Sequence, residues 1–156
     1  MLFAAMSREM TLRNVLPAII PADTYDFVIV DCNPSMGLLL TNVLAAADYL
    51  LIPVKTEMSS VEGLEDMLQL ATQIQRVLNP DLKIAGLLPT MLGSKGGENV
   101  VSYLSANYPE YTMQHNTSLN QYANQNWIKH RPVVGQKNAL GEQYRAITTE
   151  LVDRIG

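Results

Sequence analysis

The chain has 156 residues, 47% of them hydrophobic and 17% charged, and a formal net charge of -4 at pH 7. This length can bury the core of one domain, and the acidic balance argues against a generally basic nucleic-acid coat while leaving room for a local basic patch. The single cysteine, Cys32, excludes an internal disulfide and a cysteine-based metal site, and indicates a reducing cytoplasm. No apolar run approaches the roughly 18 residues of a membrane span, and the start of the chain lacks the features of a signal peptide, so we expect no membrane partner.

The first predicted element is a helix over residues 7–20, where apolar residues recur at three- and four-residue spacing. Ser7 is a suitable N-cap, because its hydroxyl can accept a hydrogen bond from a free N–H of the first turn. We expect Pro17 and Pro21 to end the helix, since proline supplies no N–H and crowds the preceding turn.

An unbroken apolar run, Phe27–Val30, follows and stops at Asp31. A short β-branched run without alternation predicts a strand buried on both faces, as in a parallel sheet. Ligands bind outside the carboxyl ends of such strands, and a carboxylate there is a suitable oxygen ligand for Mg²⁺. The simpler alternative is that Asp31 only caps the turn after the strand. Cys32 has no basic neighbour in sequence, so we interpret it as a small packing residue.

Helices and strands alternate through the rest of the chain. A long helix begins at the capping box Ser59–Glu62, and Pro89 should end the pairing of the strand after it. The predicted segments are helix Leu38–Ala47, strand Tyr49–Val54, helix 59–79, strand Ile84–Leu88, helix Asn99–Tyr108, strand Tyr111–Met113 and a helix that starts at Ala139. This alternation predicts an α/β fold, doubly wound, with a mostly parallel sheet flanked by helices. Without repeats or linkers, we expect one domain over residues 1–156.

The loop Leu92–Glu98 contains Lys95-Gly96-Gly97, which suggests a phosphate-binding loop. The x-Gly-Lys-[Ser/Thr] sequence that would complete such a loop does not follow. We therefore predict a flexible surface loop here.

The segment Asp31–Gly37, Asp-Cys-Asn-Pro-Ser-Met-Gly, resembles the Asp-Cys-Pro-Pro-Ser-Leu-Gly signature of the ParA/Soj partition ATPases. These are deviant Walker P-loop proteins, a superfamily that includes MinD. The chain departs from the signature at Asn33, where proline is usual. Further matches are Asn42–Asp48 with Ile52-Pro53 after it, Glu62–Leu64, Thr90-Met91 and Gly141–Arg145. The resemblance runs from about Ser7 to the end, so the chain is similar to the C-terminal two-thirds of a ParA-type domain, an incomplete P-loop NTPase fold.

This resemblance implies that the full-length form binds ATP and Mg²⁺. It assigns Asp31 as both a catalytic residue and the metal ligand, as for strand-terminal aspartates of P-loop nucleotidases. The residues implied to contact the nucleotide are Asn33, Pro34, Ser35, Pro53, Thr90, Met91 and Pro132. Glu57 also matches a family acid, and a solvated acid at a helix entry is an equally good interpretation of it.

The Lys-Gly-Gly-x-Gly-Lys-[Ser/Thr] loop that defines the family does not occur in these 156 residues. Since phosphoryl transfer depends on groups that this loop positions, we expect the chain alone neither to bind nucleotide tightly nor to hydrolyse ATP. The leading hypothesis is a chromosome- or plasmid-partitioning ATPase in its full-length form. The alternative is a nucleotide-inactive ParA-like interaction module that joins or blocks intact subunits. A MinD-like positioning ATPase is a weaker alternative.

The resemblance also implies self-association as a dimer or oligomer, a ParB-like partner protein, non-specific DNA binding and a nucleoid-associated location. Where the family often carries arginines, the segment His115–Leu119 has none. The basic candidates for DNA contact are Lys129, His130, Arg131 and Lys137. With so few phosphates neutralised, DNA binding should be weak and lost at raised salt.

Overall fold

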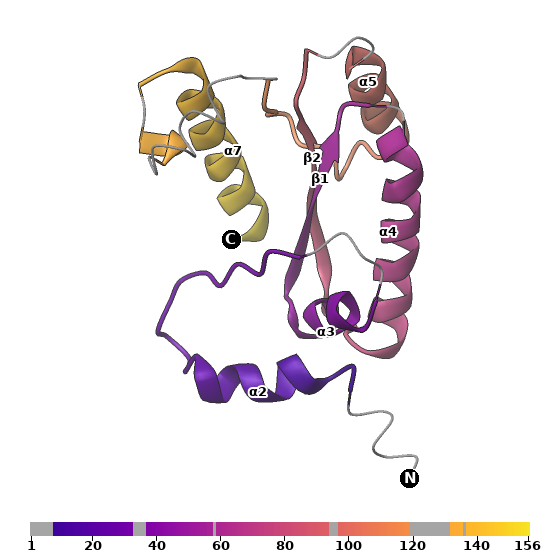
Figure 1. The fold of residues 1–156 in the computed structure, drawn as a ribbon, viewed down its shortest axis with the longest axis vertical. Coiled ribbons are helices and arrows are strands. Elements are labelled where there is room, and N and C mark those ends of the chain that lie inside the picture. The colour runs from indigo at the N-terminus through magenta and orange to yellow at the C-terminus, as the bar shows by residue number, and fades with distance from the viewer. Residues whose placement is uncertain (1–7, 33–36, 58, 94–96, 119–131, 136) are drawn as a thin grey trace. The chain divides into compact units, whose positions relative to one another are not determined.

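The computed structural model describes residues 8–32, 37–57, 59–93, 97–118, 132–135 and 137–156. Helices and strands alternate along this part of the chain, which confirms the predicted α/β class (Figure 1). In order they are α2 (Thr11–Ile19), α3 (Leu38–Ala46), β1 (Tyr49–Lys55), α4 (Ser59–Val77), β2 (Lys83–Thr90), α5 (Gly97–Asn107), the 3₁₀ helix η1 (Val133–Gly135) and α7 (Ala139–Ile155). They group into two compact units, one of Met1–Leu50 with Leu68–Lys83 and one of Leu51–Met67 with Ile84–Gly156. The expectation of a single domain stays a prediction.

Strands β1 and β2 are hydrogen-bonded neighbours in a two-stranded sheet. At the start of the strands Lys83 N donates to Asp48 O at 2.9 Å, and at their ends Thr56 N donates to Thr90 O at 3.0 Å. Because start pairs with start and end with end, the two strands run parallel. The helix α4 lies between them in sequence, so β1, α4 and β2 form the βαβ unit that the sequence predicts.

A third extended segment pairs with β2. Leu87 N donates to Tyr111 O at 2.8 Å, and Met113 N donates to Leu87 O at 2.9 Å. These bonds make one parallel bridge between Leu87 and Thr112. The strand predicted over Tyr111–Met113 is therefore present as an isolated bridge and extends the parallel pairing beyond β2.

Two prolines lie inside elements rather than at their ends, so the predictions for Pro17 and Pro89 are wrong. Proline removes a single backbone donor, and an element continues where the flanking hydrogen bonds hold it. After Pro17, Ile20 N still donates to Leu16 O at 2.8 Å. The carbonyl of Pro89 still accepts a hydrogen bond, from Thr117 N at 3.2 Å.

The run Phe27–Val30 is extended but belongs to neither strand, and its side chains are exposed, with Ile29 at 90%. The prediction of a strand buried on both faces is therefore wrong. Such a strand needs a hydrogen-bonded neighbour, and in the described part of the chain β1 and β2 pair with each other. Asp31 consequently follows an exposed extended segment.

In the first unit two buried asparagines connect segments distant in sequence. The side-chain oxygen of Asn42, on α3, accepts a hydrogen bond from Leu12 N of α2 at 3.2 Å. The Asn79 side chain donates to Leu44 O at 3.0 Å and to Ala47 O at 2.7 Å. Carbonyls at the end of a helix lack partners within it, so Asn79 completes the C-terminal end of α3.

The second unit has an apolar cluster where β2, α7 and the extended segment that contains Met113 meet. Buried Leu88, Met113 and Ile147 form this cluster, with Leu51 and Leu151 packed against it. On α7 the predicted inward positions Leu140 and Ile147 are buried, whereas Tyr144 is 43% exposed, so that part of the prediction is wrong. The cluster packs α7 against β2 and the segment at Met113.

Candidate functional site

The carboxyl ends of β1 and β2 form one edge of the sheet in the second unit. Thr56 follows β1, Thr90 ends β2, and Met91 comes directly after it. Thr56 is only 1% exposed, and its hydroxyl donates to Met91 O at 3.0 Å. In parallel sheets this edge is where ligands bind, so Thr90 and Met91 lie together where the resemblance implies nucleotide contact.

Met91 has an unusual backbone conformation at this edge, with φ of 59°. Its N–H donates to Thr117 Oγ1 at 3.2 Å, and Leu92 N donates to Thr117 O at 2.8 Å. Thr117 is buried, whereas Met91 is 45% exposed. Three chain segments therefore converge here, and a side chain of apolar and polarizable character is left facing outward.

The other sequence-predicted residues are more scattered. Pro53 is exposed within β1, and Pro132 is exposed immediately before η1. Glu57 is exposed and forms an ion pair with Lys55 at 2.7 Å, which agrees with the simpler interpretation of a solvated acid. Lys137 is exposed close to the start of α7.

Asp31 belongs to the first unit and is exposed. The adjacent Cys32 is also exposed, so its interpretation as a packing residue is wrong. Partial burial of its sulfur, together with the negative charge of Asp31, raises the pKa of the Cys32 thiol. A raised pKa keeps the sulfur protonated at neutral pH, which disfavours a role as nucleophile.

Several predicted residues lie outside the described part of the chain. They are Ser7, Asn33, Pro34, Ser35, Lys129, His130 and Arg131, together with residues 94–96 of the glycine-rich loop. Gly97, the last residue of the Lys-Gly-Gly sequence, is buried as the first residue of α5.

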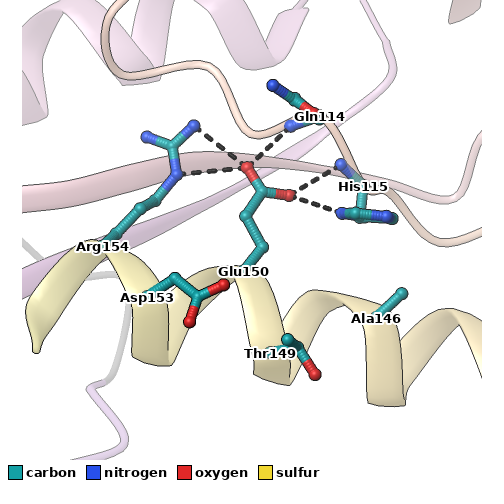
Figure 2. A pocket seen from close by; sticks show the side chains of 7 residues that line it. All are labelled: Gln114, His115, Ala146, Thr149, Glu150, Asp153 and Arg154. Atoms are coloured by element: carbon teal, nitrogen blue, oxygen red, sulfur yellow. Dashed lines mark hydrogen bonds and ion pairs between the residues drawn. The ribbon is translucent and has the colours of Figure 1, made fainter.

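A groove of about 630 Å³ lies along α7, and Figure 2 shows its lining. Seven residues line it, namely Gln114, His115, Ala146, Thr149, Glu150, Asp153 and Arg154. The carboxylate of Glu150 is its polar centre and accepts hydrogen bonds from Gln114 N at 2.8 Å and from His115 N at 2.9 Å. The ring Nδ1 of His115 and the Arg154 guanidinium also contact it, at 2.8 and 3.0 Å.

The electrostatics of Glu150 indicate a structural role. Burial by itself would raise its pKa, but the backbone hydrogen bonds from His115 and Gln114 and the side chains of His115 and Arg154 together hold the pKa below its ordinary value. A carboxylate so fully hydrogen-bonded is a weak base. Arg154 in turn donates to Thr112 O at 2.9 Å, so the pair joins α7 to the third extended segment.

Two of these features were missed from the sequence alone, the Glu150–Arg154 pair and the contacts of Thr56 and Thr117 with Met91. Glu150 and Arg154 are four residues apart, a spacing at which helical side chains meet, and this was the available signal. Their backbone partners, like the meeting of Thr56 with Met91 and Thr117, become visible only after folding.

Within the described residues no helix is long and apolar enough to span a bilayer. In the same part of the chain, no three side chains of histidine, cysteine, aspartate or glutamate gather into a metal cage.

A family model described as an AAA domain matches residues 1–84. The chain is 35% identical to the chromosome partitioning protein ParA of Myxococcus xanthus over 156 residues, which is 95% of this chain and 53% of that protein. The chain thus spans about half the length of this relative.

Two solved structures are similar. Cobyrinic acid a,c-diamide synthase of Mycobacterium smegmatis, with bound ADP and magnesium, is 33% identical, with a TM-score of 0.59 over 65% of this chain and 42% of that chain. McdA of Cyanothece in complex with ATP has a TM-score of 0.81 over 96% of this chain and 60% of that chain. Its identity is 18%, so this likeness concerns the fold alone.

Proposed function

Because this chain belongs to the AAA domain family and aligns with a ParA protein over 95% of its length, we propose that it forms the C-terminal part of a ParA-type partitioning ATPase. The near-complete alignment with the Myxococcus xanthus protein is the observation that carries the proposal. The substrate is ATP with Mg²⁺, and the biological role is segregation of a chromosome or plasmid.

Asp31 is the proposed ligand of Mg²⁺, through a direct or water-mediated contact. Its carboxylate is exposed, and it fits a site in which Mg²⁺ keeps several waters and takes further oxygens from phosphates. The bound ion would neutralise charge on the phosphates during transfer. The proposed contacts to the nucleotide are Asn33, Pro34, Ser35, Pro53, Thr90, Met91 and Pro132.

The phosphate-binding loop does not occur in these residues, so we expect no turnover from this chain alone. A chimera tests the proposal: the part of Myxococcus xanthus ParA that precedes the aligned region is joined to this chain. The chimera should hydrolyse ATP in the presence of Mg²⁺, while this chain alone, purified in the same way, should not. A folded chimera that binds no nucleotide would contradict the proposed function.

The exposed run Phe27–Val30 favours a second candidate, a nucleotide-inactive module that associates with itself or with intact ParA-like subunits. Apolar side chains in a continuous exposed segment are typical of an interaction surface. Sedimentation velocity of the chain and its Ile29→Asp variant tests this candidate. Association that the variant abolishes supports it, and a monomeric wild-type chain at micromolar concentration refutes self-association.

DNA binding, a ParB-like partner and a nucleoid-associated location belong to the same proposal. The proposed DNA contacts are Lys129, His130, Arg131 and Lys137. Reversing the charge at Lys129 and Arg131 in the chimera should weaken DNA binding and reduce its salt dependence, because counterion release scales with the phosphates neutralised. Arg76→Glu, on the exposed face of α4, is the matched control. Equal DNA binding by both variants would remove this patch from the proposal.

A further inference from the structure

Met91 is one of two non-glycine residues with positive φ in the described part of the chain. The other, Asp23, is of a residue type that tolerates this conformation, because its short polar side chain can bond locally. Methionine has no such compensation. Its left-handed conformation persists only where the surrounding structure enforces it.

Two buried hydroxyls hold Met91 from both sides. Thr56 Oγ1 donates to the Met91 carbonyl at 3.0 Å, and Thr117 Oγ1 accepts from the Met91 N–H at 3.2 Å. Thr56 and Thr117 are 1% and 6% exposed, so water does not readily replace these bonds. We propose that Thr56 and Thr117 are positioning residues, a hydroxyl clamp that enforces the left-handed conformation of Met91 at the carboxyl edge of the sheet.

The two threonines are themselves fixed by backbone hydrogen bonds. Thr56 N donates to Thr90 O at 3.0 Å, and Thr117 N donates to Pro89 O at 3.2 Å. The clamp therefore joins the ends of β1 and β2 to the segment at Thr117, and its geometry follows from the sheet. A rigid support of this kind holds a contact residue in place before a ligand arrives.

The ligand side of this inference rests on the proposed function. Met91 is 45% exposed at the edge where the nucleotide is proposed to bind, and a thioether makes favourable contacts with aromatic rings. The clamp determines the direction in which this side chain leaves the backbone. The nucleotide base would thus meet a side chain that is already oriented.

The clamp is tested without nucleotide, by comparing Met91→Gly with Met91→Ala in this chain. Both variants lose the side chain beyond Cβ, so their difference reports the cost of a Cβ at this φ, set against the greater freedom of glycine in the unfolded chain. Glycine adopts positive φ without steric conflict, and alanine does not. The glycine variant should therefore unfold roughly 2–4 °C above the alanine variant.

Removing the clamp should abolish this difference. In a Thr56→Val, Thr117→Val background Met91 is free to leave the left-handed region, and alanine should become equal to or more stable than glycine because it restricts the unfolded chain. Serine at both positions keeps the hydroxyls and should restore the advantage of glycine. Thr112→Val is the matched control: Thr112 is buried and donates to Tyr108 O at 2.8 Å, away from Met91, so the advantage should stay.

An unchanged glycine advantage in the valine background overturns the clamp, and so does equal stability of the glycine and alanine variants in the wild-type background. If the double valine chain does not fold, each single valine background gives the same comparison. Because the comparison uses no nucleotide, it is independent of the chimera. A folded chimera that binds no nucleotide contradicts the proposed function, and equal stability of the glycine and alanine variants in the wild-type background contradicts the clamp.

Discussion

Replacing Glu150 by alanine should be among the most destabilising single changes in the second unit. The carboxylate is 12% exposed and receives hydrogen bonds from Gln114 N, from His115 N and ring, and from Arg154. It is the central contact between α7 and the segment that pairs with β2 (Figure 2). Alanine would remove the carboxylate from these donors, although Arg154 would keep its hydrogen bond to Thr112 O.

The expected magnitude follows from the net contribution of each hydrogen bond that is lost. Such a bond contributes about 0.5–1.5 kcal/mol here, because the bonds from Gln114 N and His115 N are exposed and water can partly replace the carboxylate. The His115 side chain is half exposed and can be hydrated, so it is discounted. The two backbone N–H groups and Arg154 then give a loss of about 2–4 kcal/mol in the free energy of unfolding.

Urea denaturation followed by far-ultraviolet circular dichroism measures this loss. Asp153→Ala is the matched control, because Asp153 lies on the same helix and lines the same groove but is exposed. The control should change stability by less than about 0.5 kcal/mol. Equal unfolding midpoints for Glu150→Ala and Asp153→Ala would refute the central position given to this carboxylate.

Four further substitutions have expected outcomes. The pKa of Glu150 is lower in the folded chain than its ordinary value. The contribution of this carboxylate to stability is therefore complete above about pH 4.3 and is lost as the pH falls through the folded pKa. Glu150→Gln should flatten the pH dependence of the urea midpoint in that window. A Cβ at Gly86 would lie 2.8 Å from Met113 Cγ, so Gly86→Ala should destabilise the chain by about 1–3 kcal/mol in the same assay. Gly63 lies in α4 with open space around it, so Gly63→Ala should stabilise the chain by about 0.5–1 kcal/mol. Asn79→Ala should lower the thermal midpoint, because the carbonyls of Leu44 and Ala47 lose a buried donor, at a cost of about 1–3 kcal/mol in stability. A rise in stability for Gly86→Ala, or an unchanged midpoint for Asn79→Ala, would contradict these contacts.

Local signals were sufficient for most of the fold. The apolar runs at Tyr49–Val54 and Ile84–Leu88 predict strands that the structure places in a parallel pair, and the capping box at Ser59 marks the start of α4. The run Phe27–Val30 carries the same signal and is nevertheless exposed. A residue pattern reports what a segment can bury, whereas burial also requires a neighbour, and no local pattern contains that information.

The candidate site could likewise be predicted from the sequence only in part. The order of the elements is enough to place Thr90 and Met91 at the carboxyl edge, because Thr90 ends β2 and Met91 comes directly after it. Thr56 and Thr117 could not be connected to Met91 beforehand, since the three residues are far apart in sequence. A positive φ at a methionine is likewise a consequence of tertiary contacts and has no signal in composition.

The most direct measurement of the central claim is the Mg²⁺ dependence of ATP turnover by the chimera with and without Asp31. Asp31→Ala should reduce turnover at least tenfold or raise the Mg²⁺ concentration needed for half-maximal rate by a similar factor, with unchanged circular dichroism, because a metal ligand is removed. Asp66→Ala, which removes one exposed aspartate from α4, should leave both quantities unchanged. Turnover and Mg²⁺ dependence of Asp31→Ala equal to those of the unsubstituted chimera would contradict the assignment of Asp31 to the metal site.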